Sequence, residues 1–245
     1  VLFRSGSTEN GEGEHKIFHY IRSHVNEMKT SSICIHGLDA DLIILSLQHQ
    51  HLCKSITLVR GSGGDTQLDI DVLSDCIFNE LSVDKNKYYK SRIIHDYVLL
   101  SFFLGNDFLP HSPVLNIRNQ GIKHILHAYY QVLSSQGLFL TNEKREIEWS
   151  SLKKYIAFLS SMEEEYMKQE HKHIMTPMKR PVKPEDRIPH REGEQFIQPY
   201  TKGWKARYYK RLFRGPYNNQ FSIYYLKGLQ WCLHYYKMKL FFHSK

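Results

Sequence analysis

The feature that most constrains the fold of this chain is a strand–helix–strand pattern between residues 32 and 60. Residues 32–36 (SICIH) and residues 55–60 (SITLVR) are short runs rich in β-branched and apolar side chains, which is typical of buried strands. Residues 40–49 lie between them and are apolar enough to predict a buried helix. A helix is also expected from Glu14 onward, because apolar residues recur there at helical spacing. This order of elements predicts a parallel α/β core.

The rest of the chain has a mostly helical pattern. Residues 68–81 fit either a strand or a short helix, and an apolar helix is expected over residues 92–104. Further helices are expected over residues 119–134, 150–169, 202–213 and 221–239. Residues 170–199 hold five of the eight prolines and many charges, which predicts an exposed connection. We therefore expect the α/β core to be followed by an α-helical extension.

Charge is distributed unevenly along the sequence. Residues 1–110 contain 10 basic and 14 acidic residues, whereas residues 111–245 contain 23 basic and 11 acidic ones. Carboxylates in the first part are suited to hold cations, and the basic second part is suited to hold a polyanion. Two halves of an unrelated protein also differ in charge by chance, so the asymmetry alone does not decide the function.

Composition excludes several classes of protein. An aromatic content of 13% excludes an intrinsically disordered chain. The four cysteines are scattered and form no C-x-x-C pair, which favours a reducing compartment over a disulfide scaffold or a zinc ribbon. No apolar run approaches the roughly 18 residues that a membrane span needs, so we expect no membrane partner.

Acidic residues stand at the ends of three predicted elements. Glu12 and Glu14, flanked by glycines, begin the first helix, and Asp39 and Asp41 lie between the first strand and the helix after it. Asp107 follows the apolar helix over residues 92–104. Each position also has a structural explanation, because acids cap helices, complement the helix dipole and occur in helix stops. That explanation is weaker for Asp41 and Asp107, which are embedded among large apolar residues where an unpaired charge is costly.

Together the five carboxylates predict a metal site. Open α/β sheets bind ligands outside the carboxyl ends of their strands, where Asp39 and Asp41 fall. Hard divalent ions such as Mg²⁺ prefer oxygen ligands. Two such ions about 4 Å apart stabilise the attacking and leaving oxygens of phosphodiester hydrolysis, and they need several converging carboxylates to neutralise them.

At these residues the sequence resembles the 5′→3′ exoribonuclease family, which has a cytoplasmic messenger-RNA-degrading member and a nuclear relative. Three of the matching strings carry the acids, namely GEGEHKI at 11–17, GLDADLI at 37–43 and FFLGNDFLPH at 102–111. Two further strings lie in the basic half, GWKARYYK at 203–210 and YLKGLQWCLHYY at 225–236. The strings occur in the family's order and cover most of the chain, with gaps at about residues 50–90 and 165–200.

The resemblance implies a fold, a reaction and a site. The fold would be a parallel-sheet nuclease core of the PIN and flap-nuclease type, with residues 1–135 forming its C-terminal part and residues 136–245 a helical domain. The reaction would be processive release of 5′-mononucleotides from single-stranded RNA with a 5′-monophosphate. The family binds catalytic Mg²⁺, with Mn²⁺ as an alternative, through seven acids. Five of them match Glu12, Glu14, Asp39, Asp41 and Asp107.

Two departures from the family pattern affect what this chain can do alone. The family's other two metal-binding aspartates and its basic 5′-phosphate pocket lie upstream of the GEGEH motif. The residues after Tyr236 do not match the family either. We therefore expect this chain to be an internal part of a larger enzyme and to be inactive by itself. The cytoplasm is the expected compartment, with the nucleus as the alternative, because both kinds of member share these motifs.

The basic half contains a candidate RNA-binding segment. Basic side chains interleaved with aromatic ones can follow a phosphate backbone and stack on bases. We expect such contacts from Lys205, Arg207, Lys210 and Arg211. The apolar stripe formed by Trp204, Tyr208 and Leu212 is expected in the core instead, and Trp231 is expected to serve packing.

Two other functions remain open from the sequence. A flap-endonuclease-like enzyme acting on DNA uses the same cluster of carboxylates, although the motifs of the RNA family and the basic extension argue against it. The chain could also be an inactive RNA-binding scaffold that kept the fold. The presence of all five transferable acids argues against that alternative.

Overall fold

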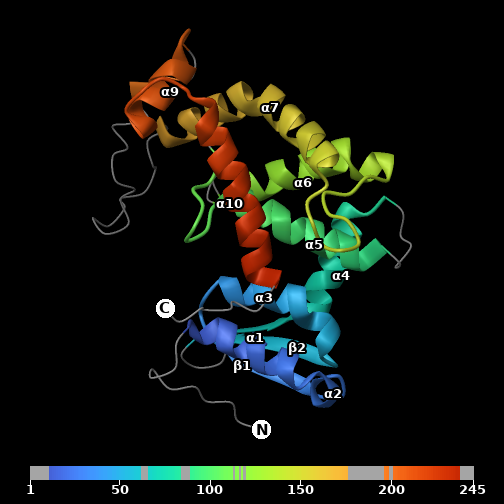
Figure 1. Ribbon diagram of the computed structural model, residues 1–245. Coiled ribbons are helices and arrows are strands. Elements are labelled where there is room, and N and C mark those ends of the chain that lie inside the picture. Colours follow the sequence, from blue (N-terminus) through green and yellow to red (C-terminus); the bar gives the residue numbers. More distant parts are fainter. Residues whose placement is uncertain are drawn as a thin grey trace.

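The computed structural model describes residues 11–61, 66–83, 89–112, 114–115, 117, 120–175, 196–198 and 201–237. A small sheet with helices against it forms one end of the molecule, and the helices from the later part of the chain form the other (Figure 1). The last described helix runs from the second group to the first. This mixed α/β arrangement with additional helices agrees with the α/β part of the expected fold class, whereas the PIN and flap-nuclease type of the core and its order before a helical extension stay predictions.

The sheet contains three strands in the described residues, β1 (Ser32–His36), β2 (Ser55–Arg60) and β3 (Thr66–Asp69), in the order β1-β2-β3. β1 and β2 are parallel, with Cys34 opposite Thr57, and the helix between them provides the crossover. The expected strand–helix–strand unit is therefore confirmed. β3 is antiparallel to β2, with Leu58 opposite Leu68, so the sheet is mixed rather than purely parallel.

The ambiguous segment over residues 68–81 contains both of the alternatives. β3 ends at Asp69, and α4 (Ile70–Leu81) begins at the next residue. The carboxylate of Asp69 accepts hydrogen bonds from the backbone N–H groups of Asp71 and Val72 at 2.8 and 3.1 Å. This N-cap satisfies donors that the first helical turn leaves unpaired, and it therefore fixes the point where the strand becomes a helix.

The remaining helices follow the expected pattern closely. The earlier ones are α1 (Gly13–Ser23), α2 (Val25–Met28), α3 (Asp41–His49) with a 3₁₀ turn at Gln50–Leu52, and α5 (Lys90–Ser101) with a 3₁₀ turn at Phe102–Leu104. The later ones are α6 (Gly121–Val132) with a 3₁₀ turn at Ser134–Gln136, α7 (Trp149–Met175), α9 (Trp204–Phe213) and α10 (Asn219–Lys237). No helix of the described part has the length and apolar character that crossing a membrane requires.

α7 is longer than the pattern predicted. It continues to Met175, six residues into the expected Pro-rich connection over residues 170–199. The first proline of that connection is Pro177, so nothing in residues 170–175 interrupts the helical hydrogen bonds. Residues 176–195 and 199, which make up most of the predicted connection, lie outside the described residues.

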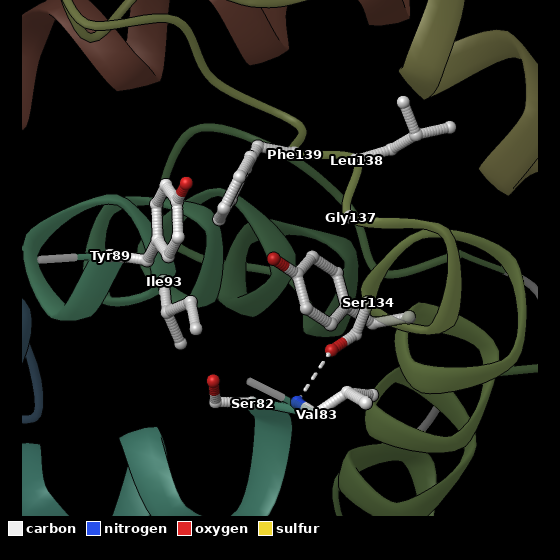
Figure 2. Close-up of a pocket in the computed structure, with 9 residues that line it drawn as sticks. Ser82, Val83, Tyr89, Ile93, Ser134, Gly137, Leu138 and Phe139 are labelled. Carbon is white, nitrogen blue, oxygen red and sulfur yellow. Dashed lines mark hydrogen bonds between the residues drawn. The ribbon is translucent and has the colours of Figure 1, made fainter. Parts of the chain in front are cut away.

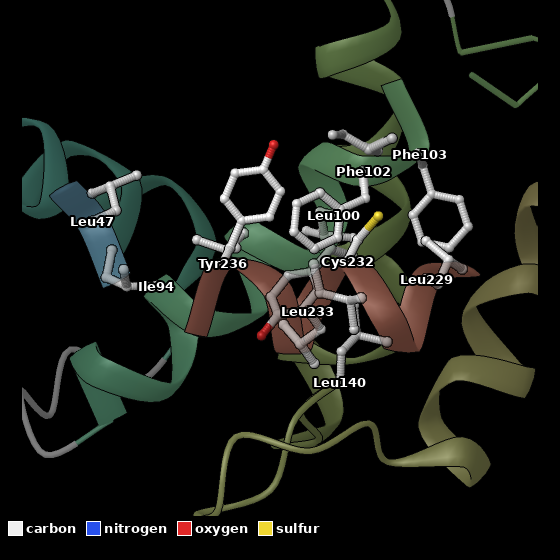
Figure 3. Close-up of a cluster of buried hydrophobic side chains, with 14 of the residues drawn as sticks. Leu47, Ile94, Leu100, Phe102, Phe103, Leu140, Leu229, Cys232, Leu233 and Tyr236 are labelled. Atoms are coloured by element: carbon white, nitrogen blue, oxygen red, sulfur yellow. The ribbon is translucent and has the colours of Figure 1, made fainter. Parts of the chain in front are cut away.

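One continuous core links the sheet layer to the helical layer. α10 packs against α3 and α5. Its buried Leu229, Leu233 and Tyr236 lie among side chains from those helices and from the segment around Leu140 (Figure 3). The boundary near residue 135 between a catalytic and a helical domain stays a prediction.

A buried carboxylate joins α5 to the segment that follows α6. Asp96 is 0% exposed and accepts four hydrogen bonds, each of 2.6 or 2.7 Å. The donors are the Tyr129 hydroxyl, the Leu140 and Thr141 backbone N–H groups and the Thr141 hydroxyl. A buried carboxylate is tolerated when its oxygens are satisfied in this way. Asp96 is therefore a structural centre rather than a member of the predicted metal site.

The apolar stripe of α9 is buried only at its beginning. Trp204 is 7% exposed and Tyr208 packs against the core, as expected, but Leu212 is 56% exposed. α9 lies at the edge of the molecule, beside one end of α7 (Figure 1), and the exposure of Leu212 shows that the described elements leave this side chain uncovered. The expectation for Leu212 was therefore wrong.

Candidate active site

The first pair of predicted acids lies at the beginning of α1. Glu12 is the N-cap residue, and its Oε2 atom accepts a hydrogen bond of 2.6 Å from the Tyr235 hydroxyl of α10. The Nε2 atom of His15 lies 4.0 Å from the same oxygen. Glu14 is half-buried in the first turn of α1, and its charge acts on the phenol of Tyr235. The end of α10 therefore lies directly beside this motif.

The second pair lies between β1 and α3. Asp39 is exposed, and its Oδ1 atom accepts a hydrogen bond of 3.0 Å from the backbone N–H of Asp41. Asp41 is the first residue of α3, and its Oδ2 atom accepts a hydrogen bond of 2.7 Å from the Tyr236 hydroxyl. The guanidinium of Arg60, at the end of β2, donates to the backbone carbonyls of Leu38 and Asp39. These contacts hold the loop at the carboxyl end of β1, where an open α/β sheet places its ligands.

Asp107 projects from a tight loop after α5. The side-chain oxygen of Asn106 accepts hydrogen bonds from the backbone N–H groups of Phe108 and Leu109 at 2.9 and 2.8 Å. Gly105 has a φ of 89°, and a Cβ atom there would lie 2.9 Å from the backbone nitrogen of His111. A side chain at position 105 would therefore be both strained and crowded. The loop holds its backbone through Asn106 and leaves the Asp107 carboxylate exposed.

The three motifs are close enough for their charges to interact. Burial raises the pKa of the Asp41 carboxyl, and the charges of Asp39, Asp107 and Glu12 raise it further. The hydrogen bond from Tyr236 acts in the opposite direction, because it stabilises the charged form. The charges of three acids from two other segments and from its own loop thus act on Asp41.

α10 contacts all three acidic motifs. Gly228 faces Leu109 so closely that a Cβ atom at position 228 would lie 2.5 Å from a Leu109 methyl group. The side-chain nitrogen of Asn106 lies 3.6 Å from the Cys232 sulfur. The ring of Phe108 meets the rings of Trp231 and Tyr235 edge-on, with centroid distances of 4.9 and 4.8 Å. One face of α10 therefore holds the Asp107 loop, while its last turn reaches Glu12 and Asp41.

The donor chemistry fits a hard divalent cation, but the described residues alone do not form a closed ligand shell. All five predicted ligands offer carboxylate oxygens, which Mg²⁺ and Mn²⁺ prefer. Within the described part of the chain, however, no three side chains of the ligating types converge on one point. Glu12 and Asp41 each direct one oxygen to a tyrosine and keep the other for a further partner.

The sequence reasoning missed Tyr235 and Tyr236. Both lie in the string YLKGLQWCLHYY that carried part of the family resemblance, and that was the only available signal. Neither residue type suggests metal chemistry. Their hydroxyls reach acids that are 223 and 195 positions away in the sequence. Trp231, which was expected to pack, stacks on Tyr235 with a centroid distance of 5.0 Å and remains 47% exposed.

The four predicted RNA-binding residues of α9 lie in different environments. The guanidinium of Arg207 donates to the backbone carbonyls of Ile197, Gln198, Thr201 and Lys202. Lys205 lies 3.3 Å from a carboxylate oxygen of Glu163. Lys210 and Arg211 are exposed, and they line a surface depression together with Arg214 and Phe196. Lys210 and Arg211 are therefore better placed than the other two to meet a polyanion.

A second cavity lies away from the acids. It is formed at the start of α5 and the end of α6, where Ser134 accepts a hydrogen bond from the backbone N–H of Val83 (Figure 2). None of the five predicted carboxylates lines this cavity, which is bordered by Ser82, Tyr89, Ile93, Tyr129, Leu138 and Phe139 among others. It therefore plays no part in the candidate site.

Comparison with known proteins gives consistent matches to one family. Residues 1–61 match the family model "XRN 5'-3' exonuclease N-terminus", and residues 87–191 match the model "Xrn1 helical domain". The first matched segment contains Glu12, Glu14, Asp39 and Asp41, and the second contains Asp107.

Similar curated proteins carry the same family name. The human protein 5'-3' exoribonuclease 1 is 33% identical over 190 residues, which is 69% of this chain and 11% of the human protein. The Schizosaccharomyces pombe 5'-3' exoribonuclease 1 is 33% identical over 191 residues, or 69% of this chain and 14% of that protein. The Arabidopsis thaliana 5'-3' exoribonuclease 2 is 28% identical over 181 residues, or 55% of this chain and 18% of that protein.

Proposed function

Because this chain belongs to the 5′–3′ exoribonuclease family, we propose that it contributes part of the active site of an enzyme that degrades RNA from its 5′ end. The supporting observation is the shared electrostatic environment of Glu12, Asp39, Asp41 and Asp107 beside the last turn of α10. The chain spans about one tenth of the length of the first curated relatives, so the activity is proposed for the whole protein.

The five acids would hold catalytic Mg²⁺, or Mn²⁺ in its place. Such an ion stabilises the charge that develops on phosphate oxygens during phosphodiester hydrolysis. In this proposal Glu12 and Glu14 contribute from the start of α1, Asp39 and Asp41 from the loop after β1, and Asp107 from the loop after α5. Their net negative charge favours cation binding and keeps the RNA backbone away from the site until the cation is present.

The proposed substrate is single-stranded RNA with a 5′-monophosphate, which the enzyme would shorten processively to 5′-mononucleotides. Its test compares the full-length protein on three labelled substrates, namely 5′-monophosphate RNA, 5′-hydroxyl RNA and single-stranded DNA of the same sequence. We expect rapid mononucleotide release from the first only. Equal cleavage of the two RNAs would contradict the proposal. Preference for DNA would favour a flap-endonuclease-like enzyme, and binding without cleavage would favour an inactive scaffold.

Removing one acid is expected to abolish most of the rate. We predict that Asp41→Ala or Asp107→Ala in the full-length protein lowers the rate of mononucleotide release by about 100-fold or more, because each removes a ligand from the proposed metal site. Asp75→Ala is a suitable control, because Asp75 pairs with Lys90 on α4 and α5 and lies in none of the three acidic motifs. An Asp41→Ala variant with the rate of the parent protein would exclude the proposed role.

The exposed cations of α9 are proposed to contact the RNA backbone. The double variant Lys210→Ala, Arg211→Ala is expected to weaken RNA binding. It should also reduce the slope of log affinity against log salt by about 1 to 2, because each phosphate contact releases about one counterion and two such contacts are removed. Lys153→Ala with Lys154→Ala, two exposed positions on α7, is the matched control. An equal effect of both pairs would show only a general influence of net charge.

The isolated 245-residue chain is proposed to be inactive. In the family resemblance, two further metal-binding aspartates and the 5′-phosphate pocket precede the first acidic motif. Metal-dependent release of mononucleotides by the purified 245-residue chain would contradict this.

We propose the cytoplasm as the compartment of the protein, with the nucleus as the alternative. Imaging of the tagged full-length protein in its own cells distinguishes the two.

A further inference from the structure

We propose that Tyr235 and Tyr236 are positioning residues, which hold the Glu12 and Asp41 carboxylates in place for the metal ion. The inference rests on the proposed function, because it concerns the same carboxylates. It assigns a role to two neutral side chains that none of the acidic motifs contains. It also explains why the last turn of α10 lies against the beginnings of α1 and α3.

The two hydroxyls make separate, direct contacts with acids from different segments. Tyr235 donates to Glu12 Oε2 at 2.6 Å, and Tyr236 donates to Asp41 Oδ2 at 2.7 Å. Hydroxyl–carboxylate hydrogen bonds of this length are of the strong, charge-assisted kind. Each bond occupies one carboxylate oxygen, fixes the rotation of the carboxyl group and leaves the second oxygen available to a cation.

The rings are held independently of their hydroxyls. Tyr236 stacks on Phe102 with a centroid distance of 5.2 Å. Tyr235 contacts His15 at 4.3 Å, Phe108 at 4.8 Å and Trp231 at 5.0 Å between centroids. Because these contacts involve ring atoms only, replacing either tyrosine by phenylalanine removes the hydrogen bond and preserves the packing. The position of each donor is therefore set before any metal binds.

Repulsion from neighbouring acids acts on Asp41. The charges of Asp39, Asp107 and Glu12 each disfavour its ionised form, whereas the hydrogen bond from Tyr236 favours it. A hydroxyl donor attached to a packed helix thus opposes the repulsion without adding a competing positive charge. Partners of metal ligands typically influence metal affinity or activity by 10- to 100-fold when they are removed.

The test measures metal binding directly in the full-length protein. Mn²⁺ is titrated into the RNA-free protein and the free ion is followed by electron paramagnetic resonance, for Tyr235→Phe, Tyr236→Phe and the double variant. Mg²⁺ dependence of the rate and RNA affinity in the presence of a chelator are measured on the same samples. Tyr225→Phe is the matched control, because Tyr225 lies on the same helix and its buried hydroxyl has no hydrogen-bond partner among the described residues.

We expect each tyrosine variant to bind Mn²⁺ about tenfold more weakly and to need correspondingly more Mg²⁺, while RNA affinity and melting temperature stay close to those of Tyr225→Phe. Unchanged Mn²⁺ affinity of the tyrosine variants overturns the inference. It is also overturned if their activity falls only in proportion to the amount of folded protein. Asp41→Ala distinguishes a failure of the positioning role from a failure of the proposed metal site. If it weakens Mn²⁺ binding and the tyrosine variants do not, only the positioning role fails. If it also has no effect, the proposed metal site itself is wrong.

Discussion

His49, at the end of α3, is a buried histidine held in its neutral form. Its Nδ1 atom lies 2.8 Å from the Leu45 carbonyl, and its Nε2 atom lies 2.6 Å from a guanidinium nitrogen of Arg22. Because Nε2 accepts a hydrogen bond from arginine, it carries no proton. The single ring proton of the neutral imidazole is therefore on Nδ1, which donates to the Leu45 carbonyl. Burial lowers the pKa of His49 to about 3. The charges of Arg22, His51 and Arg145 lower the pKa further, whereas the hydrogen bond to the Leu45 carbonyl raises it.

This histidine makes the fold sensitive to acid. The pKa of His49 in the folded protein lies below the ordinary histidine value of 6.5, so its contribution to stability is complete above pH 6.5 and is lost as the pH falls toward 3. Between pH 7.5 and 5 we expect a loss of about 2 kcal/mol from this residue, measured by urea unfolding. His49→Gln should flatten that dependence, whereas His36→Gln, at an exposed position, should not. Parallel pH curves for the parent protein and His49→Gln would contradict the assignment.

Asp96 provides a second test at the scale of single residues. At pH 7 we expect Asp96→Asn to lower the free energy of unfolding by about 2 to 4 kcal/mol, because the amide group would face buried donors that lose their acceptor. Chemical denaturation measures this change, and Glu143→Gln at an exposed position is the control. A change below about 0.5 kcal/mol would mean that Asp96 is dispensable for the α5 contact.

At the scale of elements, α10 packs closely against the Asp107 loop because residue 228 is a glycine without a side chain. Gly228 is inside a helix, where alanine is normally favoured by about 1 kcal/mol. We nevertheless expect Gly228→Ala to destabilise the protein by about 1 to 3 kcal/mol and to lower its activity, because the added methyl would lie 2.5 Å from a Leu109 methyl group. A double-mutant cycle with Leu109→Ala should show a favourable coupling of similar size. Independent effects of the two substitutions would contradict the contact.

Most of the elements were predictable from the sequence, because their local patterns are strong. The apolar runs that became β1, α3 and β2 are unambiguous, and the expected ends of α10 differ from the observed ones by two residues. β3 was not predictable as an antiparallel partner, because its four residues include polar Thr66 and Gln67 and carry no clear alternation. The pairing of β3 with β2 is a tertiary effect that a local pattern does not contain.

The candidate site was predictable only in its acids. The three motifs predicted which carboxylates form the site; the charges of Glu12, Asp39 and Asp107 act on the pKa of Asp41, and the role of all five acids as metal ligands stays a prediction. What holds them together was not predictable, because the hydrogen bonds of Tyr235 and Tyr236 join residues about 200 positions apart. Helical periodicity likewise indicated the apolar face that includes Leu212, but it carries no information about whether another element covers that face.

At the scale of the whole molecule, the sheet layer and the helical layer are expected to unfold together, because α10 packs against α3 and α5 within one continuous core. Leu229→Ala, at a position with 0% exposure, should lower the free energy of unfolding by about 2 to 5 kcal/mol and keep a single transition. Thermal unfolding followed by far-UV and near-UV circular dichroism on the same sample measures the change and shows whether the two signals follow one transition. Leu212→Ala, which is 56% exposed in the parent protein, is the control. Two separate transitions would contradict the coupling.

The distance in sequence between the acids and α10 also sets an order of events during synthesis. Glu12 and Asp41 are translated first, and their partners Tyr235 and Tyr236 follow 223 and 195 residues later. At about 5 to 20 residues per second, roughly 10 to 45 s pass before the second partner of each pair exists. During that interval the nascent chain carries its acidic motifs without the helix that orders them. During synthesis the proposed metal site therefore stays unassembled until the end of this segment has been translated.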